Sequence, residues 1–140
     1  MSQPTLNPYL NFNGNTAEAM KFYKSILGGE LSMQTFGEAN MAQNPEQRNL
    51  IVHASLKNDS IILMASDADP RRRTTFGDNV HLSLQGQDSK RLTEIFNGLA
   101  QNGRVEMPLA KQFWGDTFGM VTDKFGVHWM VNIPSQQQQR

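Results

Sequence analysis

The sequence predicts an α+β fold made of two modules with the same order of elements, strand–helix–strand–strand–strand (βαβββ). Each half of the 140 residues holds one segment with the apolar spacing of a helix, flanked by segments typical of strands. The helix-capping residues Asn15 and Asp88 lie at matching places in the two halves, and so do the helix-ending glycines Gly28 and Gly103. These matches indicate a duplicated module within a single domain, 1–140.

The first module is expected at about residues 5–67 and opens with an extended run at 7–12. A helix is predicted from Asn15, with Glu18 three residues later as in a capping box, to the Gly28-Gly29 stop. Apolar residues between these limits recur at helical spacing: Ala19, Met20, Tyr23, Ile26 and Leu27. Three more strands are expected, at 30–36, 49–57 and 60–66.

The second module is expected at about residues 78–134, after a joining segment at 68–77. Its first strand is predicted at 78–84, and Asp88 is expected to cap a helix that ends at Asn102-Gly103. The helix has apolar residues at i, i+3, i+4 and i+7: Leu92, Ile95, Phe96 and Leu99. Further strands are expected near 104–112, 117–122 and 127–133. The glutamine-rich end, 135–140, is predicted to be a disordered tail.

Two segments lack a clear period. Gly37–Arg48 lies between two expected strands and is interpreted as a flexible hairpin loop, with a lid over a pocket as the alternative. The arginines at 71–73 are interpreted as a solvated turn, with an anion site as the weaker alternative.

Composition excludes several classes of function. The chain has no cysteine, which excludes thiol nucleophiles, disulfide scaffolds and cysteine-bound metal. The 13 Lys and Arg residues balance 13 Asp and Glu residues, so the basic excess of a nucleic-acid-binding protein is absent. The apolar runs are too short to span a bilayer. A cytoplasmic protein without nucleic-acid or membrane partners is expected.

Alternation along two strands separates apolar from polar faces. In 49–57 the apolar face holds Leu50, Val52, Ala54 and Leu56, and the other face holds Ile51, His53 and Ser55. In 79–85 the apolar face holds Val80, Leu82 and Leu84, and the other face holds Asn79, His81, Ser83 and Gln85. The apolar faces are expected to pack on the helices, so His53 and His81 would line a concavity. Either histidine taken alone is also typical of a hydrogen-bonded structural residue.

Several motifs resemble the vicinal oxygen chelate superfamily, which holds glyoxalase, bleomycin-resistance proteins and extradiol dioxygenases, and most closely its PhnB-like branch. The resemblance covers roughly residues 5 to 133. The motifs are Asn7-Pro-Tyr-Leu-x-Phe12, Ala17-Glu-Ala-x-x-Phe-Tyr-Lys24, Leu63-Met-Ala-Ser-Asp67 and Phe113-Trp-Gly-Asp-x-Phe-Gly-Met-Val-Thr-Asp-x-Phe-Gly-Val-His-Trp-Met-Val-Asn132. It implies curved, mostly antiparallel sheets with outer helices, a cleft between the sheets and a homodimer.

The resemblance also implies where a metal would be held in relatives that use one. The ligand places fall at Pro8, Tyr9 or Leu10 in the first strand, at Met64, at Asn79 and at Met130. Methionine thioethers are poor ligands for hard or borderline divalent ions. We therefore expect no metal and no other cofactor in this chain.

Seven residues are the candidates for a ligand pocket: Tyr9, His53, Asn79, His81, Trp114, Asp116 and Met130. The favoured hypothesis is a PhnB-like homodimer that binds a small organic ligand in the cleft without a metal. The alternative is a glyoxalase- or dioxygenase-type enzyme, metal-dependent or with His53 or His81 as general base and Tyr9 or Asp116 orienting the substrate. An interaction role through the dimer surface is a third hypothesis.

Overall fold

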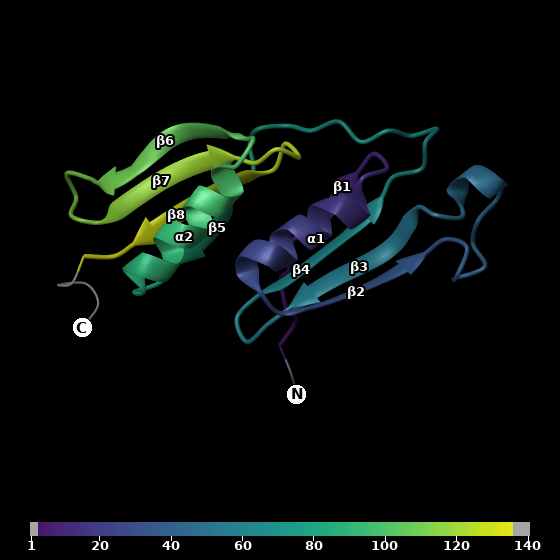
Figure 1. The fold of residues 1–140 in the computed structure, drawn as a ribbon, viewed down its shortest axis with the longest axis horizontal. Coiled ribbons are helices and arrows are strands. Elements are labelled where there is room, and N and C mark those ends of the chain that lie inside the picture. Colours follow the sequence, from purple (N-terminus) through teal and green to yellow (C-terminus); the bar gives the residue numbers. More distant parts are fainter. Residues whose placement is uncertain (1–2, 136–140) are drawn as a thin grey trace. The chain divides into compact units, whose positions relative to one another are not determined.

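The computed structural model describes residues 3–135, and each half of the chain folds as a four-stranded sheet with one helix (Figure 1). The chain divides into two compact units, unit 1 (Met1–Thr75) and unit 2 (Phe76–Arg140). Unit 1 contains β1 (Tyr9–Phe12), α1 (Thr16–Leu27), β2 (Glu30–Thr35), the 3-10 turn η1 (Pro45–Gln47), β3 (Ile51–Lys57) and β4 (Ile62–Asp67). Unit 2 contains β5 (Leu82–Gln85), α2 (Ser89–Ala100), β6 (Arg104–Lys111), β7 (Thr117–Thr122) and β8 (His128–Ile133). The predicted α+β fold of two βαβββ modules is confirmed.

The two sheets share one topology. The strand order is β1-β4-β3-β2 in unit 1 and β5-β8-β7-β6 in unit 2. The first and last strands of each unit pair in parallel, and the other neighbours are antiparallel. As a consequence, residues far apart in the sequence face each other: Tyr9 lies opposite Met64, and Ser83 lies opposite Met130.

Helix α1 covers one face of the unit 1 sheet with four of the five apolar residues that its spacing predicted, and the fifth, Ile26, is only half-buried. Ala19, Met20, Tyr23 and Leu27 are buried, together with sheet residues such as Leu56. Asn15 occupies the predicted N-cap position, but its side chain makes no capping bond.

The carboxylate of Asp67, at the end of β4, caps the N-terminus of α1. Its Oδ1 accepts from the backbone N–H groups of Gly14 and Thr16, both at 3.0 Å, and from the Thr16 hydroxyl at 2.7 Å. Its Oδ2 accepts from the backbone N–H of Ile51 at 2.8 Å. One buried side chain thus joins the start of α1 to the ends of two strands.

Helix α2 follows the sequence prediction more closely. The Asp88 side chain accepts from the backbone N–H of Arg91 at 3.1 Å, as an N-cap does. The four apolar residues at i, i+3, i+4 and i+7 are all buried: Leu92, Ile95, Phe96 and Leu99. Gly119 of β7 allows close packing here, because a Cβ at this position would lie 2.9 Å from the Phe96 ring and 2.8 Å from the Leu109 backbone.

The first strand of unit 2 is shorter than predicted. β5 begins at Leu82, not at Asp78, and Val80 is 66% exposed instead of sharing an apolar buried face. The parallel partner β8 begins only at His128, because the Asp123 carboxylate holds the preceding turn through the N–H groups of Phe125 and Val127. The pairing therefore starts with Leu82 opposite Trp129.

A β-bulge changes the face assignment at the start of β3. His53 lies opposite Gln34, but Ile51 lies opposite Thr35, so β3 holds an extra residue there. Ile51 is buried at 5% exposure, and the prediction that it shares the face of His53 is wrong. From Ala54 onward the predicted alternation holds.

Each helix of residues 3–135 has 12 residues, and neither is long and apolar enough to cross a membrane. The predicted tail lies mostly outside the described residues, but Ser135 is described and donates its backbone N–H to Asp116 at 3.0 Å.

Candidate functional site

Each sheet has one face on which its helix packs and an opposite face, here called the open face. Residues paired across neighbouring strands project on the same side of a sheet, and alternate residues along a strand project on opposite sides. This register gives the open face of unit 1 the following side chains: Tyr9, Asn11, Glu30, Ser32, Gln34, His53, Ser55, Lys57, Ile62, Met64 and Ser66. Apart from Ile62 and Met64 they are all polar. The two charged side chains, Glu30 and Lys57, lie opposite each other at one end of the strands, and the side chains around Tyr9 and His53 are hydroxyl and amide groups.

Tyr9 and His53 are brought together on this face, although 44 residues separate them. The phenol oxygen lies 3.2 Å from Nδ1 of His53, and the ring centroids are 5.8 Å apart. When the phenol donates, Nδ1 accepts and the ring proton is on Nε2, which then offers a donor. When Nδ1–H donates to the phenol oxygen, Nε2 is an unprotonated base. The pair therefore serves either recognition or proton transfer, according to the tautomer.

Ser55 is a residue of this face that the list of sequence candidates lacks. Its side chain is 7% exposed, and within residues 3–135 its hydroxyl is a buried polar atom without a hydrogen-bond partner. Its cross-strand neighbours on this face are Ser32 and Met64. Alternation with His53 was the signal for its position, but burial and the missing partner are visible only in the structure.

The open face of unit 2 is more apolar. Its side chains, assigned by the same register, are Ser83, Gln85, Arg104, Met107, Ala110, Phe118, Met120, Thr122, His128, Met130 and Asn132. Met120 lies opposite Met130, and the ring of Trp114 lies 6.1 Å from the ring of Phe118. Thioethers and aromatic rings give adaptable apolar contacts, which suits the predicted role of Trp114 and Met130.

His81 lies beside His128, with ring centroids 5.3 Å apart. Nε2 of His128 lies 3.0 Å from the Gly77 carbonyl, which only accepts, so Nε2 carries a proton. Nδ1 of His128 lies 2.8 Å from the hydroxyl of Thr122. Asn79 precedes β5 and is exposed, so Ser83, not Asn79, is the residue opposite Met130.

The Thr122 hydroxyl also contacts the Glu106 carboxylate, at 3.1 Å. The hydroxyl has one proton, so it can donate either to Glu106 or to Nδ1 of His128. The guanidinium of Arg104, followed by the hydroxyl of Thr122, holds the pKa of Glu106 below its ordinary value.

Asp116 has a different environment from the one expected of a substrate-orienting group. It is 8% exposed, and its two oxygens accept from Asn132 Nδ2 at 3.2 Å and from the Ser135 N–H at 3.0 Å. These bonds hold the Asn132 amide, which lies on the open face. The carboxylate thus positions a neighbour.

The places at which the resemblance implied a metal do not suit one. Tyr9 opposite Met64 and Ser83 opposite Met130 offer a phenol, a hydroxyl and two thioethers, without a carboxylate or an imidazole. Hard and borderline divalent ions prefer carboxylate, imidazole or carbonyl donors. Among residues 3–135, no group of three or more His, Asp or Glu side chains is arranged to hold a metal ion.

Comparison with known proteins places this geometry in a family. The chain is 36% identical to protein YjdN of Escherichia coli (strain K12), over 94% of this chain and 97% of that protein. The structure of PA1353 from Pseudomonas aeruginosa is 40% identical, covers 96% of this chain and 100% of its own, and superposes with a TM-score of 0.85. The PhnB protein from Bacillus cereus is 26% identical with a TM-score of 0.78, covering 93% and 99% of the two chains.

A more distant structure shares the fold alone. FosX from Listeria monocytogenes, a fosfomycin resistance protein solved with Mn(II) and sulfate, is 10% identical with a TM-score of 0.64. It covers 99% of this chain and 98% of its own. Residues 5–131 match the family description directly. The chain belongs to the Glyoxalase/Bleomycin resistance protein/Dioxygenase superfamily, and a PhnB protein is among its structural neighbours.

Proposed function

We propose that this protein binds a small, uncharged organic molecule on the open face of unit 1, without a metal. The observation that carries the proposal is the Tyr9–His53 pair, hydrogen-bonded at 3.2 Å on a sheet face opposite the helix. Two aromatic rings there offer apolar contact together with polar atoms at fixed positions, which is the composition of small-molecule sites.

The chemistry of the face selects the class of ligand. Around the Tyr9–His53 pair the polar groups are hydroxyl, amide, phenol and imidazole groups, which donate and accept hydrogen bonds. A neutral ligand with hydroxyl or carbonyl groups pairs with these groups. The two charged side chains of the face, Glu30 and Lys57, have opposite charge and lie opposite each other, so the face favours neither sign of ligand charge. The unpartnered Ser55 hydroxyl supports the same proposal, because a ligand that displaces the flexible Met64 side chain would supply the missing bond.

A homodimer in the cytoplasm is part of the proposal. Membership of the superfamily supports the dimer as the working assembly. Native mass spectrometry of untagged protein, purified without chelator, tests assembly, metal content and a co-purified ligand in one spectrum. A metal-free dimer is expected; a stoichiometric metal would overturn the metal-free proposal.

Binding itself is tested with 4-hydroxybenzamide, a neutral probe with a ring, a hydroxyl and a carbonyl. Titration followed by amide NMR shifts should perturb the β1, β3 and β4 residues of unit 1. Tyr9→Phe removes the phenol oxygen but keeps the ring, and should weaken the probe by about five- to ten-fold, the value of one hydrogen bond. Tyr23→Phe is the matched control, because Tyr23 is a fully buried residue of α1, which packs on the face opposite to the open face. Equal affinity in wild type and Tyr9→Phe would contradict the proposal.

The second candidate is a histidine-based enzyme, and the same pair favours it. In the tautomer with Nδ1–H donating to the phenol, Nε2 of His53 is a positioned general base. If His53 is catalytic, His53→Gln abolishes turnover of a substrate while the melting temperature stays nearly unchanged. Turnover that persists in His53→Gln would exclude this role.

A further inference from the structure

A small pocket lies in unit 1, where the β2–β3 connection meets the segment after β4. Its volume is about 140 Å³. Five apolar side chains form most of its lining: Phe36, Met41, Leu50, Ala68 and Pro70. Three polar residues complete it: Gln43, Gln47 and Asp69. All eight lie outside the bounds of β1–β4, in the connections that follow β2 and β4.

The segment that forms the pocket is well organised, although its sequence predicted an irregular loop. The Phe36 N–H donates to Leu50 at 2.9 Å, and the Gly37 N–H donates to Arg48 at 3.0 Å, which extends the hairpin beyond the strands. Turn η1 is capped by the Asn44 side chain, which accepts from the Gln47 N–H at 3.1 Å. These bonds hold Gln47 in a defined position.

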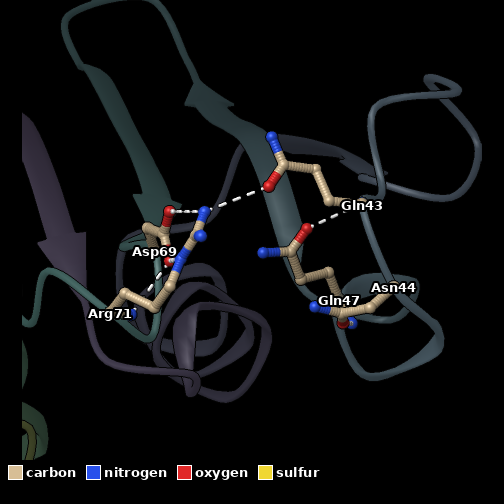
Figure 2. Close-up of polar contacts among 5 residues, drawn as sticks. All are labelled: Gln43, Asn44, Gln47, Asp69 and Arg71. Atoms are coloured by element: carbon tan, nitrogen blue, oxygen red, sulfur yellow. Dashed lines mark hydrogen bonds and ion pairs between the residues drawn. The ribbon is translucent and has the colours of Figure 1, made fainter.

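Gln47 presents an unused donor to the pocket. The residue is 7% exposed, and its Oε1 accepts from the backbone N–H of Gln43 at 2.9 Å. A backbone N–H only donates, so this bond fixes which end of the amide is oxygen and which is nitrogen. Within residues 3–135 the Nε2 group has no hydrogen-bond partner. Figure 2 shows the nitrogen turned toward the side of Asp69 and Arg71.

An ion pair of Asp69 and Arg71 lies beside the pocket, and Arg72 adds a positive charge near Asp69. Arg71 lies 3.2 Å from the Asp69 carboxylate and also donates to Gln43 Oε1 at 3.0 Å (Figure 2). The backbone N–H of Arg71, followed by its side chain, holds the pKa of Asp69 below its ordinary value. The carboxylate is thus ionised and paired at neutral pH. An anionic ligand would meet this carboxylate, and a cation would compete with an arginine already in place.

We propose that this pocket is a second binding site, which takes a neutral carbonyl compound with a compact apolar body and pairs the carbonyl oxygen with Gln47 Nε2. A cavity of roughly 150 Å³ accommodates a benzene ring, so the volume suits a single ring or a branched chain of similar size. Water in the pocket would meet mainly apolar walls, and its displacement by an apolar body is favourable.

Benzamide is the probe. Toluene, which lacks the carbonyl group, and benzoate, which carries a negative charge, are the comparators. The titration is followed by NMR shifts of backbone amides and of the Gln47 side-chain amide. Benzamide should bind with a dissociation constant on the order of millimolar, as expected of so small a ligand. Shifts should map to residues 36–50 and 68–70, and toluene and benzoate should each bind about five-fold or more weakly. No saturation by benzamide, or equal binding of toluene, would overturn the proposal.

Two matched substitutions isolate the donor. Gln47→Glu keeps the oxygen that accepts from Gln43 but removes the Nε2 donor, and should weaken benzamide about five-fold or more. Gln43→Glu makes the same change of charge in the same pocket but keeps the proposed donor, and should change the affinity less than about two-fold. Equal losses in both variants would refute the role of Gln47. The wild-type comparison of benzamide with toluene decides the proposal independently if Gln47→Glu unfolds. Shifts confined to β1, β3 and β4 would instead belong to the open face, so the two proposals fail separately.

Discussion

Replacing Ser55 by alanine should stabilise the ligand-free protein, the reverse of the usual sign for a buried polar substitution. The wild-type hydroxyl is buried at 7% exposure and has no partner, so folding removes it from water without compensation. Mutational data put that cost at about 1–3 kcal/mol. Ser55→Ala also removes the packing contacts of the hydroxyl oxygen, which offsets part of this gain in stability. We expect a net gain of about 1 kcal/mol in the free energy of unfolding, or a rise of about 4 °C in melting temperature.

Ser66→Ala is the matched control on the same open face. The Ser66 hydroxyl donates to Asn11 Oδ1 at 3.2 Å, so its removal should cost about 0.5 kcal/mol. Melting is followed by far-UV circular dichroism on protein shown by native mass spectrometry to carry no ligand. The two variants should shift in opposite directions. A Ser55→Ala variant that is destabilised as much as Ser66→Ala would show that the hydroxyl has a partner, and the argument would fail.

Three further comparisons test the account of the fold and its charges. Asp67→Ala leaves four donors without their carboxylate and should cost about 3 kcal/mol or more in urea unfolding, whereas the single-bond cap mutant Asp88→Ala should cost about 1 kcal/mol. Equal costs in the two variants would contradict the role of Asp67 in joining the start of α1 to β3 and β4. Because the folded-state pKa of Glu106 is lowered from 4.5, its stabilisation is present above that pH and lost as the pH falls through the lowered value. The difference in melting temperature between wild type and Glu106→Gln should therefore vanish in acid. A difference that stays constant with pH would refute a stabilising role of the Glu106 carboxylate. Trp129→Ala should cost about 4 kcal/mol and the 45%-exposed Trp114→Ala much less, measured by the same melts; the reverse order would place Trp114 in the core.

Local signals in the sequence predicted most elements correctly. The apolar spacing of α2 and its cap at Asp88 act within one or two turns of a helix, so they can be read without the rest of the chain. The glycine at position 28 likewise ends α1 with a φ of 75°. These features depend on neighbours in the sequence and were visible in advance.

The features that the sequence missed depend on distant partners. The cap of α1 comes from Asp67, 51 residues beyond Thr16, instead of from Asn15. The bulge near Ile51 and the late start of β5 depend on strand register, which alternation alone does not determine.

In the candidate site, too, the features set by neighbours in the sequence were predicted and those set by distant partners were not. Alternation placed His53 and Ser55 on one face, but nothing local indicated that Tyr9 would reach His53 or that the Ser55 hydroxyl would lack a partner. Asn79 was proposed from the resemblance, but it precedes β5, and the residue that pairs with Met130 is Ser83.

The use of the buried carboxylates supports a ligand without charge. Among residues 3–135 the buried acidic side chains are Asp67, Asp116 and Asp123, and each accepts hydrogen bonds that hold segments of chain together. Asp123, for example, also accepts from Trp129 Nε1 at 2.8 Å. Such carboxylates cannot turn to a ligand without leaving donors unpaired in the core. We therefore expect recognition on the open face of unit 1 to depend on the phenol of Tyr9 and the imidazole of His53, which favour hydroxyl and carbonyl partners, because the charges of Glu30 and Lys57 on that face oppose each other.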